Sequence, residues 1–193
     1  PFDDEEVIAG QGTIGLEILS QMIDVDAIVV PVGGGGLVAG VAFAVKSVNP
    51  RVQVYGVQAE GAPSMANSLR EKKVCALPSV STIADGIAVK QPSTHTFDYC
   101  EKYVDGIVTV SDDEIATAIL TLIEKQKMIA EGAGATPVAA ILAGKLPQLK
   151  GKKVCCVVSG GNIDVTILSR VIQRGLLTSG RQCTLNIELL DKP

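Results

Sequence analysis

At 193 residues the chain is long enough for one complete hydrophobic core. Its net charge of −4, the absence of a long basic run and an aromatic content of 3% disfavour nucleic-acid binding. The long apolar stretches are too short or are interrupted by glycine, and no signal peptide is present, so we expect a cytoplasmic protein without a membrane partner. The five cysteines form no C-x-x-C pair, which favours reduced thiols over disulfides or metal binding.

Strand-like and helical patterns alternate along the chain. Apolar residues at helical spacing, from Ile14 to Ile23, predict a helix over residues 13–23. Residues 71–100 are less regular, and the single histidine, His95, is expected there in a surface loop. The remaining patterns predict strands at 27–32, 52–57, 104–110 and 153–158, and helices at 37–48, 63–70, 111–127, 136–144 and 163–175. This alternation predicts an α/β fold, a mostly parallel sheet with helices on both faces.

The last thirteen residues have a different pattern. Cys183, Leu185, Ile187 and Leu189 alternate with polar residues, which predicts a half-buried strand. Because no hairpin partner is present in the chain, we expect a further domain after residue 193. The chain also opens without methionine, so we expect it to be a piece of a longer protein.

A run of four glycines, Gly33–Gly36, lies between the strand at 27–32 and the helix at 37–48. A helix start offers free N–H groups and partial positive charge, and glycine lets the backbone approach an anion, so this turn predicts a phosphate site. A tight turn without a ligand is one alternative. Another is a dinucleotide site, because Gly34, Gly36 and Ala39 fit G-x-G-x-x-A and Glu60 follows the next strand. A Walker A loop is excluded because no Gly-Lys-Ser/Thr follows.

A second strand-to-helix turn contains Ser159, Gly160 and Gly161. In a parallel sheet the carboxyl ends of the strands share one edge, where ligands bind. Both glycine turns therefore face the same crevice, and Ser159 would offer a neutral hydroxyl to the far end of one ligand. An ordinary helix cap is the alternative role for Ser159.

A set of motifs occurs in one order along the chain. They are AGQGTIGLEIL at 9–19, VPVGGGGLVAG at 30–40, GVQAEGAPSM at 56–65, TIADGIAV at 82–89, VSDDEI at 110–115, EGAGA at 131–135 and VVSGGNIDV at 157–165. In these motifs and their order, the sequence resembles the fold-type-II pyridoxal-phosphate (PLP) enzymes, and within them the serine/threonine dehydratases and serine racemases. The likeness is greatest to threonine dehydratases (threonine ammonia-lyases) of the biodegradative type.

The resemblance implies a tryptophan-synthase-β-like fold that is incomplete here. Residues 1–177 would be the C-terminal large part of the PLP-binding catalytic domain, and 178–193 a linker and the first strand of an ACT regulatory domain. The implied reaction is β-elimination of L-threonine, and also of L-serine, to 2-oxobutyrate or pyruvate plus ammonia. Serine racemase, L-serine dehydratase, a non-catalytic fragment and a dinucleotide-binding domain are the alternatives. A homo-oligomer is implied by analogy only.

The resemblance also assigns roles to individual residues. The amides of Gly33, Gly34, Gly35 and Gly36, with Leu37, match the loop that holds the cofactor phosphate. Ser159 matches the hydrogen-bond partner of the pyridine nitrogen, with Gly160 beside it. Gly86 and Glu131 match positions that line the cofactor pocket, although Glu131 could be an ordinary helix-end carboxylate. Glu60 matches the first acidic residue of a divalent-cation site, but Ala66 replaces the later aspartate, which leaves a monovalent ion as the alternative.

The catalytic lysine of the family is not in this sequence. It belongs to a Ser-x-Lys-x-Arg motif upstream of the glycine loop, and none of the lysines here stands in that context. We therefore expect this chain to lack the Schiff-base nucleophile and to be inactive alone. An N-terminal segment of the same enzyme would supply the lysine and the loop that binds the substrate carboxylate.

Overall fold

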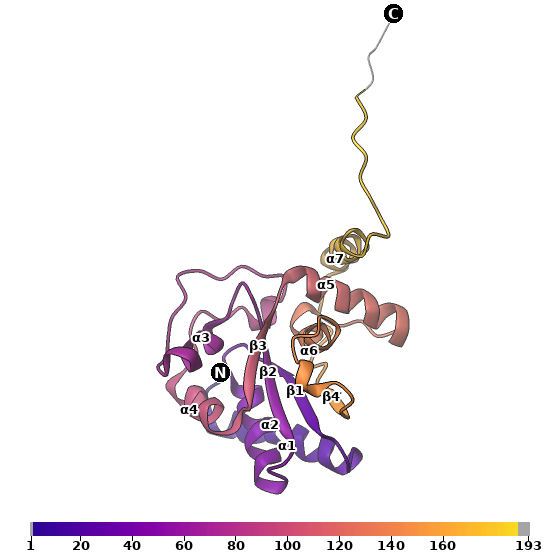
Figure 1. Ribbon diagram of the computed structural model, residues 1–193. Helices are drawn as coiled ribbons and strands as arrows, with labels where there is room; N and C mark the ends of the chain where they lie inside the picture. Colours follow the sequence, from indigo (N-terminus) through magenta and orange to yellow (C-terminus); the bar gives the residue numbers. More distant parts are fainter. Residues whose placement is uncertain (1, 189–193) are drawn as a thin grey trace, which may run out of the picture.

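The computed structural model describes residues 2–188 and contains a parallel sheet with helices on both faces, which confirms the predicted α/β class (Figure 1). The strands are β1 (Ala27–Pro31), β2 (Gln53–Ala59), β3 (Gly106–Val110) and β4 (Val154–Cys156). The helices are α1 (Glu5–Gln21), α2 (Gly36–Val48), α3 (Ser64–Glu71), α4 (Thr94–Tyr103), α5 (Asp112–Thr121), α6 (Gly132–Leu142) and α7 (Val165–Thr178). A π-helical turn (Leu122–Gln126) extends α5, and short 3-10 turns lie at Asp85–Ile87 and Pro147–Leu149.

The strand order is β3-β2-β1-β4, and every pairing is parallel. Ala27 of β1 lies opposite Gln53 of β2 and Val154 of β4. Since β1 and β4 are neighbours with the same direction, the turns that follow them leave the sheet side by side at its carboxyl edge. This topology is what brings the two glycine turns together.

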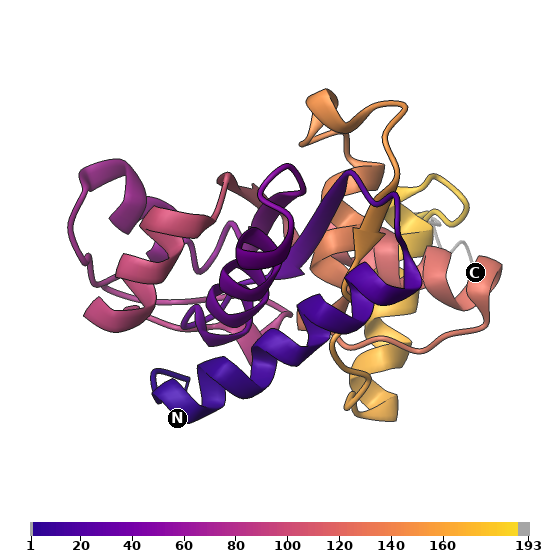
Figure 2. The same ribbon diagram turned by 90° about the horizontal axis from the view of Figure 1, so that it is seen from below.

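Two hydrophobic clusters cover the two faces of the sheet. All residues of β1 are buried, and alternate residues serve opposite faces. Ile28 and Val30 pack with α2 and α4, whereas Ala27 and Val29 pack with α5 and α6. Figure 2 shows α1 and α2 side by side, with α5, α6 and α7 gathered apart from them. Burial on both faces explains the continuous Val/Ile run in this strand.

Helix α1 begins earlier than residue 13, which makes the predicted start wrong. The Asp4 carboxylate caps it by accepting from the N–H groups of Glu6 (2.9 Å) and Val7 (3.3 Å). The helix ends at Gln21, so Ile23 lies beyond it and is 89% exposed instead of joining the apolar face. Val7 and the buried Ile8 already belong to the helix, and the cap with its acidic first turn places its start at Glu5.

Helix α4 was not predicted, and it carries His95. Ser93 is its N-cap and accepts a hydrogen bond from the N–H of Thr96 (3.1 Å). His95 is therefore helical and not in a loop, although its side chain is 36% exposed as a surface residue would be. The sequence of α4 is rich in Thr, Tyr and His, which have only modest helix propensity, so local preference gave little signal.

Helix α6 starts at Gly132 and places Pro137 in its interior, so the predicted start at Thr136 is wrong. A proline there cannot donate to the carbonyl of Ala133. The hydroxyl of Thr136 donates to that carbonyl instead, at 2.9 Å. The Thr-Pro pair is thus accommodated inside the helix rather than marking its first turn.

The C-terminal part departs from the prediction in two ways. Gly175 lies inside α7 and does not end it, because its missing side chain lets α7 approach the carbonyl of Ala116 on α5. Residues 182–188 form no strand, and Leu185 and Ile187 are 76% and 73% exposed (Figure 1). A single strand without a neighbour is not stable. The predicted position of Leu189 lies outside the described residues.

Across residues 2–188, no helix is both long enough and apolar enough to cross a bilayer.

Candidate active site

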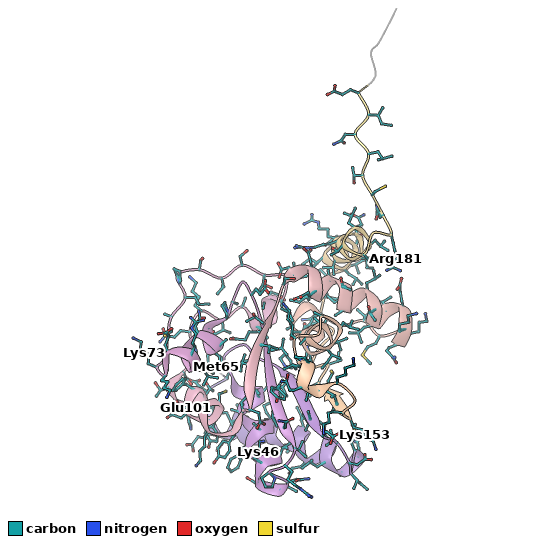
Figure 3. All side chains as sticks on the ribbon, in the orientation of Figure 1. Lys46, Met65, Lys73, Glu101, Lys153 and Arg181 are labelled. Carbon is teal, nitrogen blue, oxygen red and sulfur yellow. The ribbon has the colours of Figure 1, made fainter. Side chains whose placement is uncertain are left out.

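The tetraglycine turn joins β1 to α2. Gly35 is the N-cap of α2 and has φ +99°, in the left-handed region that favours glycine. A Cβ atom there would lie 2.7 Å from the Cε of Met65, which is labelled in Figure 3 and reaches the turn from α3. Within residues 2–188, none of the N–H groups from Gly33 to Leu37 donates to a protein acceptor. The positive end of α2 therefore presents unused donors suited to an anion.

Phe2 lies directly against the same turn. A Cβ atom on Gly34 would overlap the Phe2 ring, and one on Gly36 would overlap the Phe2 carbonyl oxygen. Phe2 is 37% exposed, so its ring covers the turn from the solvent side. This contact leaves no room for a side chain at Gly34 or Gly36.

The turn after β4 packs on the first turn of α6. A Cβ atom on Gly134 would lie 2.7 Å from the carbonyl oxygen of Gly160, and the N–H of Glu131 donates to that oxygen at 3.1 Å. A Cβ atom on Gly160 would overlap the carboxylate of Glu131. The small residues of EGAGA thus let the second glycine turn contact α6 and place the Glu131 carboxylate beside it.

The segment Thr82–Ile87 lies against the tetraglycine turn, since a Cβ atom on Gly33 would lie 3.1 Å from the Cα of Ile87. Asp112 anchors it by accepting from the Thr82 hydroxyl (2.6 Å) and the Ile83 N–H (3.2 Å). Gly86, near the end of this segment, faces Glu131, because a Cβ atom on Gly86 would lie 3.8 Å from Glu131 Oε1. The motifs TIADGIAV and VSDDEI are therefore joined by hydrogen bonds at Thr82 and Ile83.

Two cavities lie at this edge of the sheet. The first, of about 600 Å³, is lined by Gly36, Leu37 and Ser159 together with Phe2. The second, of about 610 Å³, is lined by Glu131 together with residues from 82–85 and from 162–174. The hydroxyl of Ser159 is exposed and makes no hydrogen bond to any described residue. The predicted cofactor residues are thus brought together around the two glycine turns.

Glu60 is not part of this group. Its carboxylate lies 3.6 Å from the Nζ of Lys145, which also contacts Glu114 at 3.1 Å. The hydrogen bond to Glu114 raises the pKa of the Lys145 ammonium above its ordinary value. No cluster of three His, Cys, Asp or Glu residues suited to a metal occurs within the part that the structure describes. The metal role expected for Glu60 stays a prediction.

The thiols of β4 are poor candidates for a nucleophile. Burial, with a smaller contribution from Cys155, raises the pKa of the Cys156 thiol to about 12. Burial also raises the pKa of Cys155. Both thiols therefore stay protonated near neutral pH, and only a thiolate is strongly nucleophilic.

Two residues of the site were missed by sequence reasoning. Phe2 gave no signal, because its contact with Gly34 and Gly36 joins distant parts of the chain. Thr96 is completely buried and donates its hydroxyl proton to the carbonyl of Gly34 at 2.7 Å. Ser93 is a typical N-cap residue and could have indicated α4, though not this contact.

Comparisons with known proteins agree with this geometry. The sequence profile of the family described as "Pyridoxal-phosphate dependent enzyme" matches residues 1–160. An L-threonine ammonia-lyase from Thermotoga maritima is 54% identical over all 193 residues, which correspond to 48% of that protein. A threonine deaminase structure from Solanum lycopersicum superposes with a TM-score of 0.87 at 40% identity, over 92% of this chain and 49% of that one. A serine racemase from Dictyostelium discoideum gives a TM-score of 0.79 at 39% identity, over 86% and 53%. The chain spans about half the length of these relatives.

Proposed function

Because the chain belongs to the pyridoxal-phosphate dependent enzymes, we propose that it forms about half of a threonine dehydratase. The complete enzyme converts L-threonine to 2-oxobutyrate and ammonia, and L-serine to pyruvate and ammonia as a second reaction. The identity to an L-threonine ammonia-lyase across the whole chain supports this substrate. The serine racemase has a lower TM-score and covers less of this chain than the Solanum threonine deaminase, so racemase activity is the alternative.

The observation that carries the proposal is the set of unused amides at the tetraglycine turn, which lines one cavity together with Ser159 of the second glycine turn. The N–H groups of Gly33–Leu37, at the positive end of α2, would hold the phosphate of the cofactor. The hydroxyl of Ser159 would be the hydrogen-bond partner of the pyridine nitrogen, with Gly160 beside it. Gly86 and Glu131 would line the pocket of the ring. The residues fit the cofactor because, within residues 2–188, the N–H groups of Gly33–Leu37 donate to no protein acceptor, and Ser159 is exposed in the cavity that Gly36 and Leu37 also line.

When bound, the cofactor supplies an electron sink that makes the α-proton of an amino acid easier to remove. Ser159 offers the ring nitrogen a neutral hydroxyl and holds no proton there. A carboxylate at this position would raise the pKa of the nitrogen and keep it protonated. A less electron-poor ring favours prompt elimination over transamination, which fits a dehydratase.

The rest of the enzyme supplies the remaining chemistry. We assign the Schiff-base lysine to an N-terminal part of the polypeptide, since no Ser-x-Lys-x-Arg motif occurs here and the chain spans 48% of the Thermotoga enzyme. We assign residues 178–193 to a linker and the first strand of an ACT domain, on the alternation from Cys183 onward. A homo-oligomer rests on the family resemblance, and a cytoplasmic location on the five free cysteines.

The test uses the complete polypeptide loaded with pyridoxal phosphate. We expect 2-oxobutyrate from L-threonine, and none from the 193-residue chain alone. Ser159→Asp should lower the elimination rate by about tenfold or more, equivalent to about 1.4 kcal/mol of barrier, whereas Ser159→Thr keeps the neutral hydroxyl and most of the rate. Formation of D-serine without 2-oxobutyrate would favour the racemase, and unchanged turnover in Ser159→Asp would contradict the role of Ser159.

A further inference from the structure

A side chain on α4 holds the tetraglycine turn from the protein interior. Thr96 is completely buried, and its hydroxyl donates to the carbonyl of Gly34 at 2.7 Å, across 62 positions of sequence. The Ser93 hydroxyl lies 3.1 Å from the Thr96 hydroxyl and can donate to it, so the two hydroxyls and the carbonyl form one chain of hydrogen bonds. Such chains strengthen each bond in them.

Among the described residues, Thr96 is the only donor to the carbonyl of Gly34. Gly34 is buried, and within residues 2–188 no backbone N–H donates to its oxygen. Helix α2 begins too late to use it, since the first bond at this end runs from Ala39 to Gly35. Without Thr96 the carbonyl would therefore be a buried acceptor without a partner, which the chain can relieve by rotating the peptide group.

The peptide geometry connects this bond to the cavity side. The carbonyl of Gly34 and the N–H of Gly35 belong to one planar trans peptide group, so they point in opposite directions. With the oxygen directed inward to Thr96, the N–H of Gly35 is directed away from α4. The Cα of Gly35 is also confined, because a Cβ atom there would lie 3.0 Å from the Cβ of Thr96 and 2.7 Å from Met65 Cε.

We propose that Thr96 is a positioning residue that aims the N–H of Gly35 at the phosphate of the cofactor. It touches neither cofactor nor substrate. This inference rests on the proposed function, which places the phosphate at this turn. Figure 1 shows α4 and α3 on the same side of the sheet as α2, from where both can reach the turn.

The test compares two ligands that differ only in the phosphate, pyridoxal phosphate and pyridoxal. Both are titrated into the apo form of the complete polypeptide. Thr96→Val keeps the shape of the side chain and removes the donor, so its Kd for pyridoxal phosphate should rise by about tenfold or more, while its Kd for pyridoxal changes by less than about twofold. Thr96→Ser keeps the donor and should retain the wild-type preference for the phosphorylated ligand.

The matched control is Thr136→Val. Thr136 is also completely buried, and its hydroxyl also donates to a backbone carbonyl, that of Ala133. It should lower stability without changing the ratio of the two Kd values. If Thr96→Val does not fold, Thr96→Ser and Thr96→Ala provide a second pair in which both lose the methyl group and only alanine loses the donor.

Three results would overturn the inference while leaving the proposed function intact. They are an equal loss of affinity for both ligands in Thr96→Val, an unchanged Kd for pyridoxal phosphate in Thr96→Val, and the same change of ratio in Thr136→Val. A wild-type protein that does not prefer pyridoxal phosphate over pyridoxal would instead overturn the proposed phosphate site and this inference together.

Discussion

Replacing Gly134 by alanine tests the close packing of the second glycine turn on α6. In an exposed helix, alanine is more favourable than glycine by about 1 kcal/mol. At Gly134, however, the new Cβ would lie 2.7 Å from the carbonyl oxygen and 3.0 Å from the nitrogen of Gly160. Both are backbone atoms, so no flexible side chain can move aside. The steric cost and the helix gain therefore oppose each other directly.

The steric cost should be the larger of the two. Ordinary van der Waals contact begins near 3.4 Å, so the Ser159–Gly160 turn must shift by several tenths of an ångström. Overpacking of this kind costs about 1–3 kcal/mol. After the helix gain, we expect Gly134→Ala to lower the free energy of unfolding by about 1 kcal/mol. The shift would also displace Ser159, so the affinity for pyridoxal phosphate should fall.

Gly10→Ala is the matched control, because the same change occurs in a helix without a neighbour. Gly10 is exposed on α1, and a Cβ atom there meets nothing within 4 Å. The free energy of unfolding of this variant should be higher than that of the wild type by about 0.5–1 kcal/mol. Urea unfolding followed by far-UV circular dichroism is suitable, since the chain has no tryptophan. If Gly134→Ala is stabilised as much as Gly10→Ala, the packing argument for the EGAGA motif is wrong.

Two further predictions concern groups outside the glycine turns. Asp112→Ala removes the acceptor of both the Thr82 hydroxyl and the Ile83 N–H, so the free energy of unfolding measured in urea should fall by about 2 kcal/mol. An unchanged midpoint of urea unfolding would contradict this anchoring role. Burial raises the pKa of the Cys100 thiol from 9.0 to about 12, so the stability linked to it is complete below pH 9.0 and is lost as pH rises toward about 12. Cys100→Ala should reduce that loss by up to about 1.4 kcal/mol per pH unit, and equal alkaline slopes in both proteins would refute it.

The sheet could be predicted because its signal is local. Strands of a parallel sheet are buried on both faces, so β1 appears as an unbroken run of Val and Ile that no surface helix would carry. The glycine turns could be predicted for the same reason, since each directly follows such a strand. Helix ends were less reliable where a side chain decided them, as when Asp4 extends α1 by accepting from Glu6 and Val7.

The contacts that α4 and Phe2 make with the tetraglycine turn could not be predicted from local sequence patterns. Helix α4 buries Phe97 and Cys100 but is otherwise polar and rich in modest helix formers, so its stability depends on packing against α2 and α3. The contact of Thr96 with Gly34 exists only once that packing has formed. Phe2 reaches Gly34 in the same way, from the N-terminal end of the described chain. A glycine turn can thus be identified from sequence as able to bind phosphate, whereas the direction of its amides is set by residues that become neighbours only in the folded protein.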